Sequence, residues 1–407
     1  MTAARTALVA LAATLAIQIY VAFAATLTAV LAPEMAREFG VEARWVGVFI
    51  GIVYGGGMLG SLASGGFIER HGAIRVSQVC VLLCAIGVAV MALAPARAPA
   101  LLALAAVVIG LGYGPVTPAS SQLLQRTAPP SRMALTFSIK QTGVPAGAAL
   151  SGALLPVLAL AIGWRAAFAL VALAGVVVVA VSQPIRASLD ADRRAHGRFT
   201  FAGIFAPLAV LRQSRALRDL ALVSLAYSAT QVCLTSFLVV YLTETLRWTL
   251  VGAGLALASA TIAGVAGRIG WGYVADRLLA PRHVLALIGL AACACGIVMA
   301  LATGEWPASA IIALAAVFGG TAIGWNGVQL SEVARLAPAG NAGKVTGASG
   351  FVTFAGVVIG PPSFAVLATL TGSYRVGFAT FAALSATAAL ALLRGGTRGT
   401  RGGRASP

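Results

Sequence analysis

The chain has 407 residues, of which 59% are hydrophobic and only 10% are charged. Soluble domains carry about 25% charged residues, so this composition excludes a soluble globular protein and predicts a surface that faces lipid. The net charge of +17 would indicate a nucleic-acid partner for a soluble chain, but the positions of the basic residues argue against such a partner here.

Long apolar runs occur along the whole chain and predict its fold class. A membrane-spanning helix needs roughly 20 mainly apolar residues, and runs that are continuous rather than alternating favour helices over a barrel. We therefore predict an all-α membrane protein with twelve transmembrane helices, and interpret the first run as a retained span rather than a removed signal peptide. The runs lie near 8–32, 45–67, 74–95, 100–124, 134–161, 165–183, 217–242, 250–273, 282–303, 307–331, 345–370 and 375–393.

One long polar segment, 184–216, interrupts these runs and predicts the domain boundaries. We expect an N-terminal six-helix bundle at 1–183, a cytoplasmic linker at 184–216 and a C-terminal six-helix bundle at 217–393. A basic cytoplasmic tail follows at 394–407. The linker charges, which include Asp190 and Asp192, are interpreted as a solvated surface, with contact to anionic lipid left open.

The basic residues are distributed unequally between the two sides of the predicted membrane. With the N-terminus in the cytoplasm, 20 of the 28 Lys and Arg residues fall on the cytoplasmic side and 6 on the other. Positive residues collect on the cytoplasmic side of membrane proteins. This pattern predicts a multi-pass protein of a bacterial-type inner membrane with both termini in the cytoplasm.

The second half of the chain repeats landmarks of the first at a nearly constant offset. GGFIERHG at 65–72 matches GYVADR at 272–277, and VVIGLGYG at 107–114 matches AVFGGTAIG at 316–324. Parallel repeats of six spans are related by an axis along the membrane normal, and the two halves rock about a central site. The repeat therefore predicts two six-helix bundles with pseudo-two-fold symmetry and a site between them.

With twelve spans, a central basic loop and these paired signatures, the sequence resembles the major facilitator superfamily of secondary transporters. The resemblance implies that the two signature loops latch a cytoplasmic gate. In each loop the acid would meet a neighbouring helix N-terminus and the arginine would form an ion pair. The expected gating residues are Glu69, Arg70, Asp276 and Arg277.

Two basic residues lie inside predicted spans instead of at their ends. Lys140 lies eight residues after Arg132, and Arg268 lies eight residues before Asp276. At 1.5 Å per residue, each is about 12 Å inside its span, close to the midplane of a hydrocarbon core about 30 Å thick. A cation at this depth costs roughly 2.5–3.5 kcal/mol, so we expect each to face a cavity or a partner.

None of the eleven acids is placed at the midplane, so the expected partner of these cations is an anionic substrate. The resemblance places the fifth and eighth spans together across the domain interface, where Lys140 and Arg268 would approach each other. The alternative is that each side chain extends to cytoplasmic water. Further polar or aromatic groups are expected to shape the site: Thr117, Asn326, Tyr20, Tyr113, Gln141, Tyr227, Gln231 and Trp325.

The segment from Arg268 to Gly272 resembles the monocarboxylate and oxalate/formate branches of the superfamily, in which an arginine precedes the second signature. Gly264 replaces the acid of the first branch, and Lys140 lies on a different span from the lysine of the second. We therefore expect alternating-access transport of a small mono- or dicarboxylate. Proton symport is favoured because a negative cytoplasm opposes anion uptake by about 2.3 kcal/mol per charge per 100 mV, and anion exchange stays open.

Two other functions are weighed against anion transport. The first is proton-driven efflux of drugs. Antiporters of this kind often carry a Gly-x-x-x-Gly-Pro pattern in the fifth span, but here Ala148 follows Gly147 in place of the proline. A receptor or scaffold that docks a partner through the basic tail is the second. We expect no enzyme, cofactor or metal site, because the five cysteines lie in spans and the three histidines in loops. The expected partners are the anion, protons and the bilayer, and the expected state is a monomer.

Overall fold

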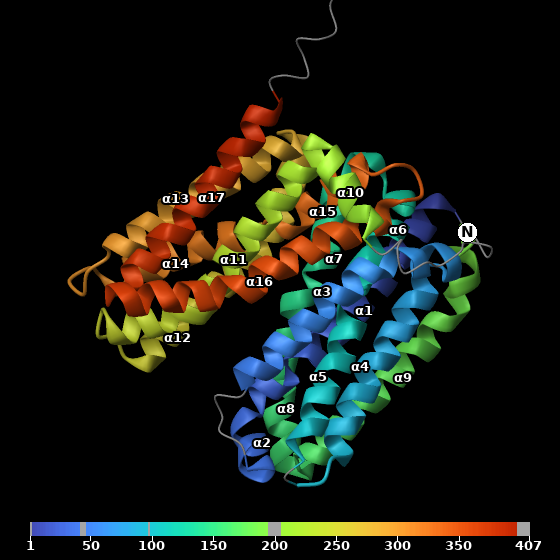
Figure 1. Ribbon diagram of the computed structural model, residues 1–407, viewed down its shortest axis with the longest axis horizontal. Coiled ribbons are helices and arrows are strands. Elements are labelled where there is room, and N and C mark those ends of the chain that lie inside the picture. Colours follow the sequence, from blue (N-terminus) through green and yellow to red (C-terminus); the bar gives the residue numbers. More distant parts are fainter. Residues whose placement is uncertain (1, 41–45, 97, 194–204, 397–407) are drawn as a thin grey trace, which may run out of the picture. The chain divides into compact units, whose positions relative to one another are not determined.

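The structure is a computed structural model that describes residues 2–40, 46–96, 98–193 and 205–396. Parts of two predicted segments, residues 194–204 of the linker and 397–407 of the tail, lie outside the described residues. Within the described ranges the chain is helical and contains no strand (Figure 1).

The helices in chain order are α1 (Ala3–Val30), α2 (Ala32–Phe39), α3 (Val46–His71), α4 (Ala73–Leu93), α5 (Pro99–Tyr113), α6 (Val116–Thr127), the 3₁₀ turn η2 (Pro130–Arg132), α7 (Met133–Gln141), α8 (Gly143–Ile162), α9 (Trp164–Leu189), α10 (Ala206–Gln213), α11 (Arg215–Glu244), α12 (Leu250–Arg277), α13 (Pro281–Leu301), α14 (Ala308–Ala322), α15 (Asn326–Leu336), α16 (Ala342–Thr371) and α17 (Tyr374–Gly396). Twelve stretches among the described residues are long and apolar enough to cross a membrane. The predicted all-α membrane fold is confirmed.

Three of these spans are made of two consecutive helices each. The breaks lie between α5 and α6, between α7 and α8, and between α14 and α15. The first break contains Gly114 and Pro115. Proline has no backbone N–H and clashes with the preceding turn, so it interrupts a helix. A break leaves backbone groups without partners inside the helix and creates a polar position within an apolar segment.

Contacts group the chain into two compact units. Unit 1 comprises Met1–Pro129, Lys140–Ala209 and Ala337–Phe351; unit 2 comprises Pro130–Ile139, Val210–Leu336 and Val352–Pro407. The predicted bundles follow chain order, whereas residues 130–139 group with unit 2 and residues 337–351 with unit 1. The physical reason lies in the first turns of α7 and α16, which bind acidic side chains of α12 and α3 respectively.

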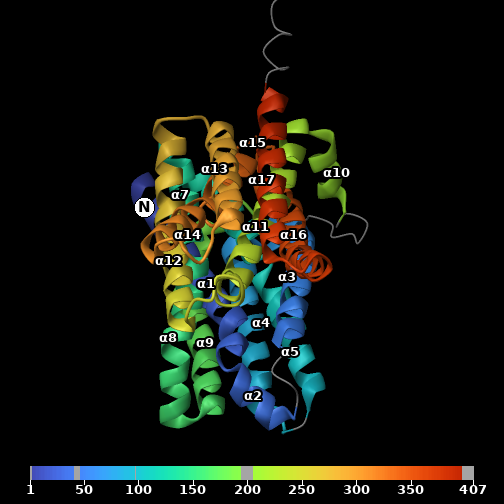
Figure 2. The same cartoon turned by 90° about the vertical axis from the view of Figure 1, so that its left-hand side faces the viewer.

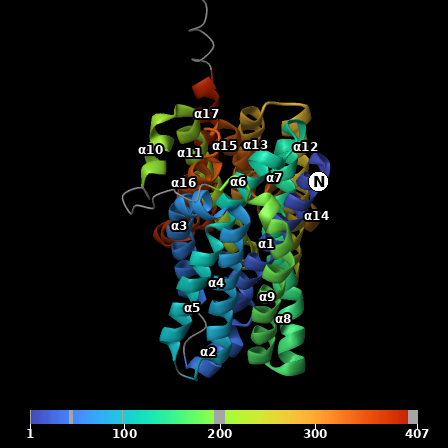
Figure 3. The same cartoon turned by 90° about the vertical axis from the view of Figure 1, so that its right-hand side faces the viewer.

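Each unit is built on the same plan. In unit 1, α4 packs against α9 and α3 against α5; these helices are visible in Figure 3. In unit 2, α13 packs against α17 and α12 against α14; α13 and α17 lie side by side in Figure 2. Glycines allow close approach at matching places, because a Cβ at Gly110 would clash with the backbone of Val53, and one at Gly319 with that of Ala260. The internal repeat predicted from the sequence is therefore present in the packing.

Matching arginines also make matching contacts in the two units. Arg165, at the start of α9, donates to the carbonyl oxygen of Ala92 at 2.7 Å. Arg375, at the start of α17, donates to the carbonyl oxygen of Ala302 at 2.9 Å. The two arginines are 210 residues apart in the sequence, and so are the two residues whose carbonyl oxygens they bind. In each unit this pair ties the beginning of one span to the end of another.

The arginine contact in unit 1 extends to Glu38 and predicts a pH effect. Arg165 and Trp164 both donate to this carboxylate, and the Arg165 hydrogen bonds hold the pKa of Glu38 below its ordinary range. A lowered pKa in the folded state stabilises the fold above the unfolded pKa, and the stabilisation is lost as pH falls through the folded value. Wild type should unfold about 1–4 °C above Glu38→Gln at neutral pH, with a difference that disappears between about pH 5 and pH 3.

Thermal unfolding of the purified protein across this pH range tests the prediction. The control is Glu34→Gln, because Glu34 pairs with Arg37 on an exposed part of α2 and exposed pairs contribute little. A gap between wild type and Glu38→Gln that stays constant with pH would show that the carboxylate charge is not what stabilises this end of unit 1.

Candidate functional site

The candidate site residues gather at the three helix breaks. Six of the ten residues selected as substrate-binding lie in a break or within two residues of one. At the α5–α6 break these are Tyr113 and Thr117, at the α7–α8 break Lys140 and Gln141, and at the α14–α15 break Trp325 and Asn326. Discontinuous helices of this kind form the ligand sites of many membrane proteins, so the breaks give these residues a shared structural setting.

Lys140 is the centre of a polar cluster in unit 1, which we call the lysine cluster: Lys140, Gln18, Thr117 and Gln141. The Lys140 side chain is only 1% exposed. Its Nζ donates to Gln18 Oε1 at 2.7 Å, to Gln141 Oε1 at 2.9 Å and to Thr117 Oγ1 at 3.3 Å. The alternative in which this lysine extends to water is therefore wrong.

Glycines of α8 explain why Gln18 reaches the lysine. A Cβ at Gly143 would press on the Gln18 side chain, and one at Gly147 would clash with the backbone of Ile19. The absence of side chains lets α1 and α8 approach closely, as expected for small residues four apart. This packing carries Gln18 of α1 to the end of α7, where Lys140 lies.

The chemistry of the lysine cluster is that of a retained positive charge. The three acceptors named above are neutral amide and hydroxyl oxygens, which stabilise the ammonium without cancelling its charge. The four named residues together carry a formal charge of +1. An ammonium has three N–H donors, so an anion that binds Lys140 has to replace one of these acceptors, and a charged hydrogen bond is about twice as strong as a neutral one.

Two separate contacts at the α14–α15 break of unit 2 involve Arg268, Gln231 and Trp325, which we together call the arginine cluster. Arg268 is 2% exposed, and its Nε donates to the carbonyl oxygen of Ile323 at 3.1 Å within the α14–α15 break. Trp325 is 1% exposed and donates from Nε1 to Gln231 Oε1 at 3.1 Å. Arg268 thus does not extend to solvent either, and its helix α12 is fixed against the break.

Two tyrosines selected from the sequence instead hold helices together. The hydroxyl of Tyr20 donates to the carbonyl oxygen of Val171 at 3.2 Å. The hydroxyl of Tyr227 donates to the carbonyl oxygen of Leu285 at 2.7 Å, and its ring meets Trp325 edge-on at 5.8 Å. Tyr20 and Tyr227 occupy equivalent positions, 207 residues apart. Both hydroxyl groups donate their hydrogen bond to a backbone carbonyl oxygen, and a sequence pattern does not predict such a contact.

The two remaining candidates are half-buried at the edges of the breaks. Tyr113 is the last residue of α5, and its ring lies edge-on to Tyr54 with centroids 6.2 Å apart. Asn326 is the first residue of α15. Both are positioned to present a polar group beside a helix end, in unit 1 and unit 2 respectively.

The expected gating acids both contact the first turn of a helix. The carboxylate of Asp276 accepts hydrogen bonds from the backbone N–H groups of Ala134 at 2.9 Å and Leu135 at 2.8 Å, at the start of α7. A carboxylate at the positive end of a helix is stabilising. Glu69 forms an ion pair with Lys344 in the first turn of α16.

The expectation for the gating arginines is wrong in one respect. Arg70 and Arg277 are exposed, and neither makes an ion pair within the part of the chain that the structure describes. Each is the last or next-to-last residue of its helix. A cation at a helix C-terminus is favourable without a carboxylate partner, which accounts for their position.

Asp190 is a buried residue that the sequence interpretation placed on a solvated surface. It is only 4% exposed, and its carboxylate accepts from the backbone N–H groups of Ile74 at 2.8 Å and Arg75 at 3.0 Å, at the start of α4. Burial raises the pKa of Asp190, and the two backbone hydrogen bonds oppose the shift. Gly72 predicts a helix stop and a following N-terminus in need of an acceptor, but no local pattern identifies Asp190 as that acceptor.

Comparison with known proteins identifies the family. Residues 14–361 match the family model of the Major Facilitator Superfamily. The chain belongs to the major facilitator superfamily. It is therefore a secondary transporter and not an enzyme, and the resemblance stated from the sequence is confirmed.

Individual members of the superfamily are only distantly similar. The chain is 27% identical over 71 residues to a hexuronate transporter of Bacillus subtilis, covering 17% of each protein. It is 36% identical over 118 residues to a probable nitrate/nitrite transporter of Mycobacterium tuberculosis, covering 28% of this chain and 29% of that one. The fucose:proton symporter of E. coli has the same fold, with a TM-score of 0.73, 18% identity, and 96% of this chain and 99% of that one covered.

Proposed function

We propose that this superfamily member transports a small organic anion, a mono- or dicarboxylate, by alternating access. The observation that carries the proposal is the buried ammonium of Lys140, held by three neutral oxygens at a helix break. Hexuronate, nitrate and nitrite, named for the two relatives with local similarity, are all anions. This supports an anionic cargo without indicating which one.

The proposed roles follow the two clusters. Lys140 and Arg268 supply positive charge to the substrate carboxylate. Thr117, Gln141, Asn326 and Gln231 orient it by hydrogen bonds, and Trp325 and Tyr113 form apolar walls. Tyr20 and Tyr227 position the helices that carry the clusters. The meeting of Lys140 and Arg268 across a central cavity stays part of this proposal.

The gating residue Asp276 is connected to Lys140 through α7 and to Arg268 through α12. Asp276 binds the N-terminus of α7, and Lys140 lies six residues beyond Ala134 on that helix. Asp276 also lies eight residues after Arg268 on α12. One carboxylate is thus connected by helix segments of about 9 and 12 Å to the two residues that would bind the anion. Release of the Asp276 contact would let α7 and α12 move apart, each with its own cation.

Coupling to protons is the energetic part of the proposal. A proton carried with the anion cancels the cost of about 2.3 kcal/mol per charge per 100 mV for uptake into a negative compartment. The proton would travel on the substrate or leave from Lys140. The arginine distribution supports an inner-membrane location with both termini in the cytoplasm, and the protein is proposed to work as a monomer.

Uptake into proteoliposomes tests the function. We expect labelled small carboxylates to accumulate when the outside is acidic, and a protonophore to abolish accumulation. Neutral sugars should not accumulate. If carboxylate accumulation does not depend on the proton gradient but requires an anion inside the proteoliposomes, the mechanism is anion exchange and not proton symport. Extrusion of cationic dyes without carboxylate uptake would contradict the proposal and indicate drug efflux.

A further inference from the structure

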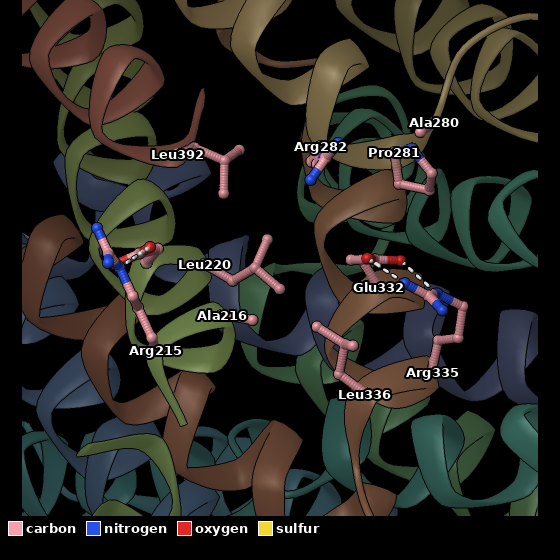
Figure 4. Close-up of a pocket in the computed structure, with 11 residues that line it drawn as sticks. Arg215, Ala216, Leu220, Ala280, Pro281, Arg282, Glu332, Arg335, Leu336 and Leu392 are labelled. Atoms are coloured by element: carbon pink, nitrogen blue, oxygen red, sulfur yellow. Dashed lines mark hydrogen bonds and ion pairs between the residues drawn. The ribbon is translucent and has the colours of Figure 1, made fainter. Parts of the chain in front are cut away.

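A cavity of about 540 Å³ opens at one end of unit 2, apart from both clusters. It is enclosed by the first turns of α11 and α13 and the last turns of α15 and α17 (Figure 4). Three arginines, Arg215, Arg282 and Arg335, line it together with Asp219 and Glu332. Volumes of about 300–1,000 Å³ are typical of ligand sites, so the cavity is large enough to hold a small molecule or a lipid head group.

The charged side chains that line the cavity differ in how closely they are paired. Glu332 forms a two-point ion pair with Arg335, with distances of 2.7 and 2.6 Å. Asp219 lies 3.9 Å from Arg215. Arg282 is exposed and makes no ion pair with any residue that the structure describes. The five charged side chains that line the cavity sum to +1, and Arg218, which lies 4.0 Å from Asp219, raises the local sum to +2. The cavity therefore keeps an excess of positive charge that an anion would reduce.

The equivalent place in unit 1 is occupied by the chain itself. Arg75 and Arg282 are 207 residues apart, and Arg126 and Arg335 are 209 apart, so both pairs follow the repeat. In unit 1 the start of α4 binds the carboxylate of Asp190, which follows the last turn of α9. The repeat thus shows which kind of group this position accepts, namely an oxyanion against a helix N-terminus.

Asp190 has no acidic counterpart at the matching sequence position of unit 2, and the two acids that line the cavity, Asp219 and Glu332, pair with arginines. The position 210 residues after Asp190 is Thr400, and the sequence from 397 to the end contains no Asp or Glu.

The start of α13 has no side-chain cap, Pro281 has no N–H, and the N–H of His283 donates to the carbonyl oxygen of Ala280. We therefore expect the side chain of Arg282 to provide the main donors for a ligand at this end of α13. A second arginine, Arg215 of α11, lies on the other side of the cavity, where it pairs with Asp219 (Figure 4).

We propose that this cavity binds a phosphodiester anion, with Arg282 as its main contact and the start of α13 as its electrostatic support. Arginine guanidinium groups match phosphate oxygens in geometry, and a helix N-terminus favours an anion. Leu220, Leu336 and Leu392 contribute apolar surface between the charged side chains. A lining of arginines and leucines fits the head group and glycerol of a membrane phospholipid better than a bare inorganic ion. Bound there, the lipid would join α11, α13, α15 and α17 as Asp190 joins α4 and α9.

Lipid retention by the full chain tests the proposal. Native mass spectrometry would measure binding of phosphatidylglycerol to delipidated wild type, to Arg282→Gln and to the repeat-matched control Arg75→Gln. We expect about tenfold weaker binding for Arg282→Gln, the loss of a charged hydrogen bond, and wild-type binding for Arg75→Gln. Leu392→Phe, which fills the cavity and leaves its charge unchanged, should also weaken binding.

A second arm distinguishes the source of the phosphate. Glycerol phosphate in solution should raise the thermal stability of wild type far less than phosphatidylglycerol in neutral nanodiscs, if the ligand is a lipid. The opposite order supports the same site with a soluble ligand. Equal binding of phosphatidylglycerol to wild type, Arg282→Gln and Leu392→Phe, or equal loss in Arg282→Gln and Arg75→Gln, overturns the proposal.

Discussion

Replacing Lys140 with alanine is expected to lower carboxylate uptake at limiting substrate by about 30-fold or more. Removing one member of a buried, hydrogen-bonded charge pair costs roughly 2–5 kcal/mol, and each 1.4 kcal/mol is a factor of ten. The variant also leaves the oxygens of Gln18 and Gln141 without the ammonium that binds them. Initial uptake rates in proteoliposomes, normalised to reconstituted protein, measure the effect.

The matched control for this variant is Ser151→Ala. Ser151 is buried in α8, near Lys140 in sequence, and its hydroxyl has no hydrogen-bond partner within the described chain. Its removal should leave uptake within about twofold and the unfolding temperature unchanged or higher. If Lys140→Ala transports as well as Ser151→Ala, the lysine does not bind the substrate. A loss of transport with an equal loss of unfolding temperature would mean that the lysine is structural, and Lys140→Arg would then fail to restore binding.

The second large effect is expected for Asp276→Asn, at the gate. An asparagine side chain has one acceptor oxygen instead of two and places an NH₂ group against a backbone N–H. The contact with Ala134 and Leu135 would lose most of two charge-assisted hydrogen bonds, each about 1.5–3 kcal/mol. Hydrogen exchange at the start of α7 should therefore become at least about tenfold faster, and the balance between gate states should shift by a similar factor.

The control for the gate is Arg277→Gln on the adjacent position of α12. Arg277 is exposed and has no ion pair among the residues described, so exchange at Ala134 and Leu135 should match wild type. Exchange measured by mass spectrometry on peptides from 130–141 would separate the two variants. Equal protection of these peptides in wild type and Asp276→Asn would show that the carboxylate does not hold α7.

The span count and the internal repeat could be predicted because they depend on local hydrophobicity and on landmark spacing. The depth of Lys140 and Arg268 followed from helix rise alone, and the structure confirms that both are buried. Their immediate partners could not be predicted in the same way. Gln18 lies 122 residues from Lys140 in sequence, and only the close packing of α1 on α8 brings it there.

Two other features depend on tertiary contacts that no local pattern contains. The hydroxyls of Tyr20 and Tyr227 point toward backbone carbonyls of neighbouring helices, because rotamers and packing decide where a long side chain ends. Asp190 belongs to a polar, charged segment in which solvated residues are the ordinary expectation. Its burial follows from the unfilled N-terminus of α4, which the fold places beside it.

The central claim, that buried cations bind an anion, is tested most directly by comparing a carboxylate with its neutral amide on the purified protein. The two ligands have nearly the same shape and differ in charge. Carboxylates should raise the unfolding temperature of wild type, their amides should not, and the shift should be lost in both Lys140→Ala and Arg268→Ala. Equal stabilisation by carboxylate and amide, or an undiminished carboxylate shift in both variants, would contradict the account.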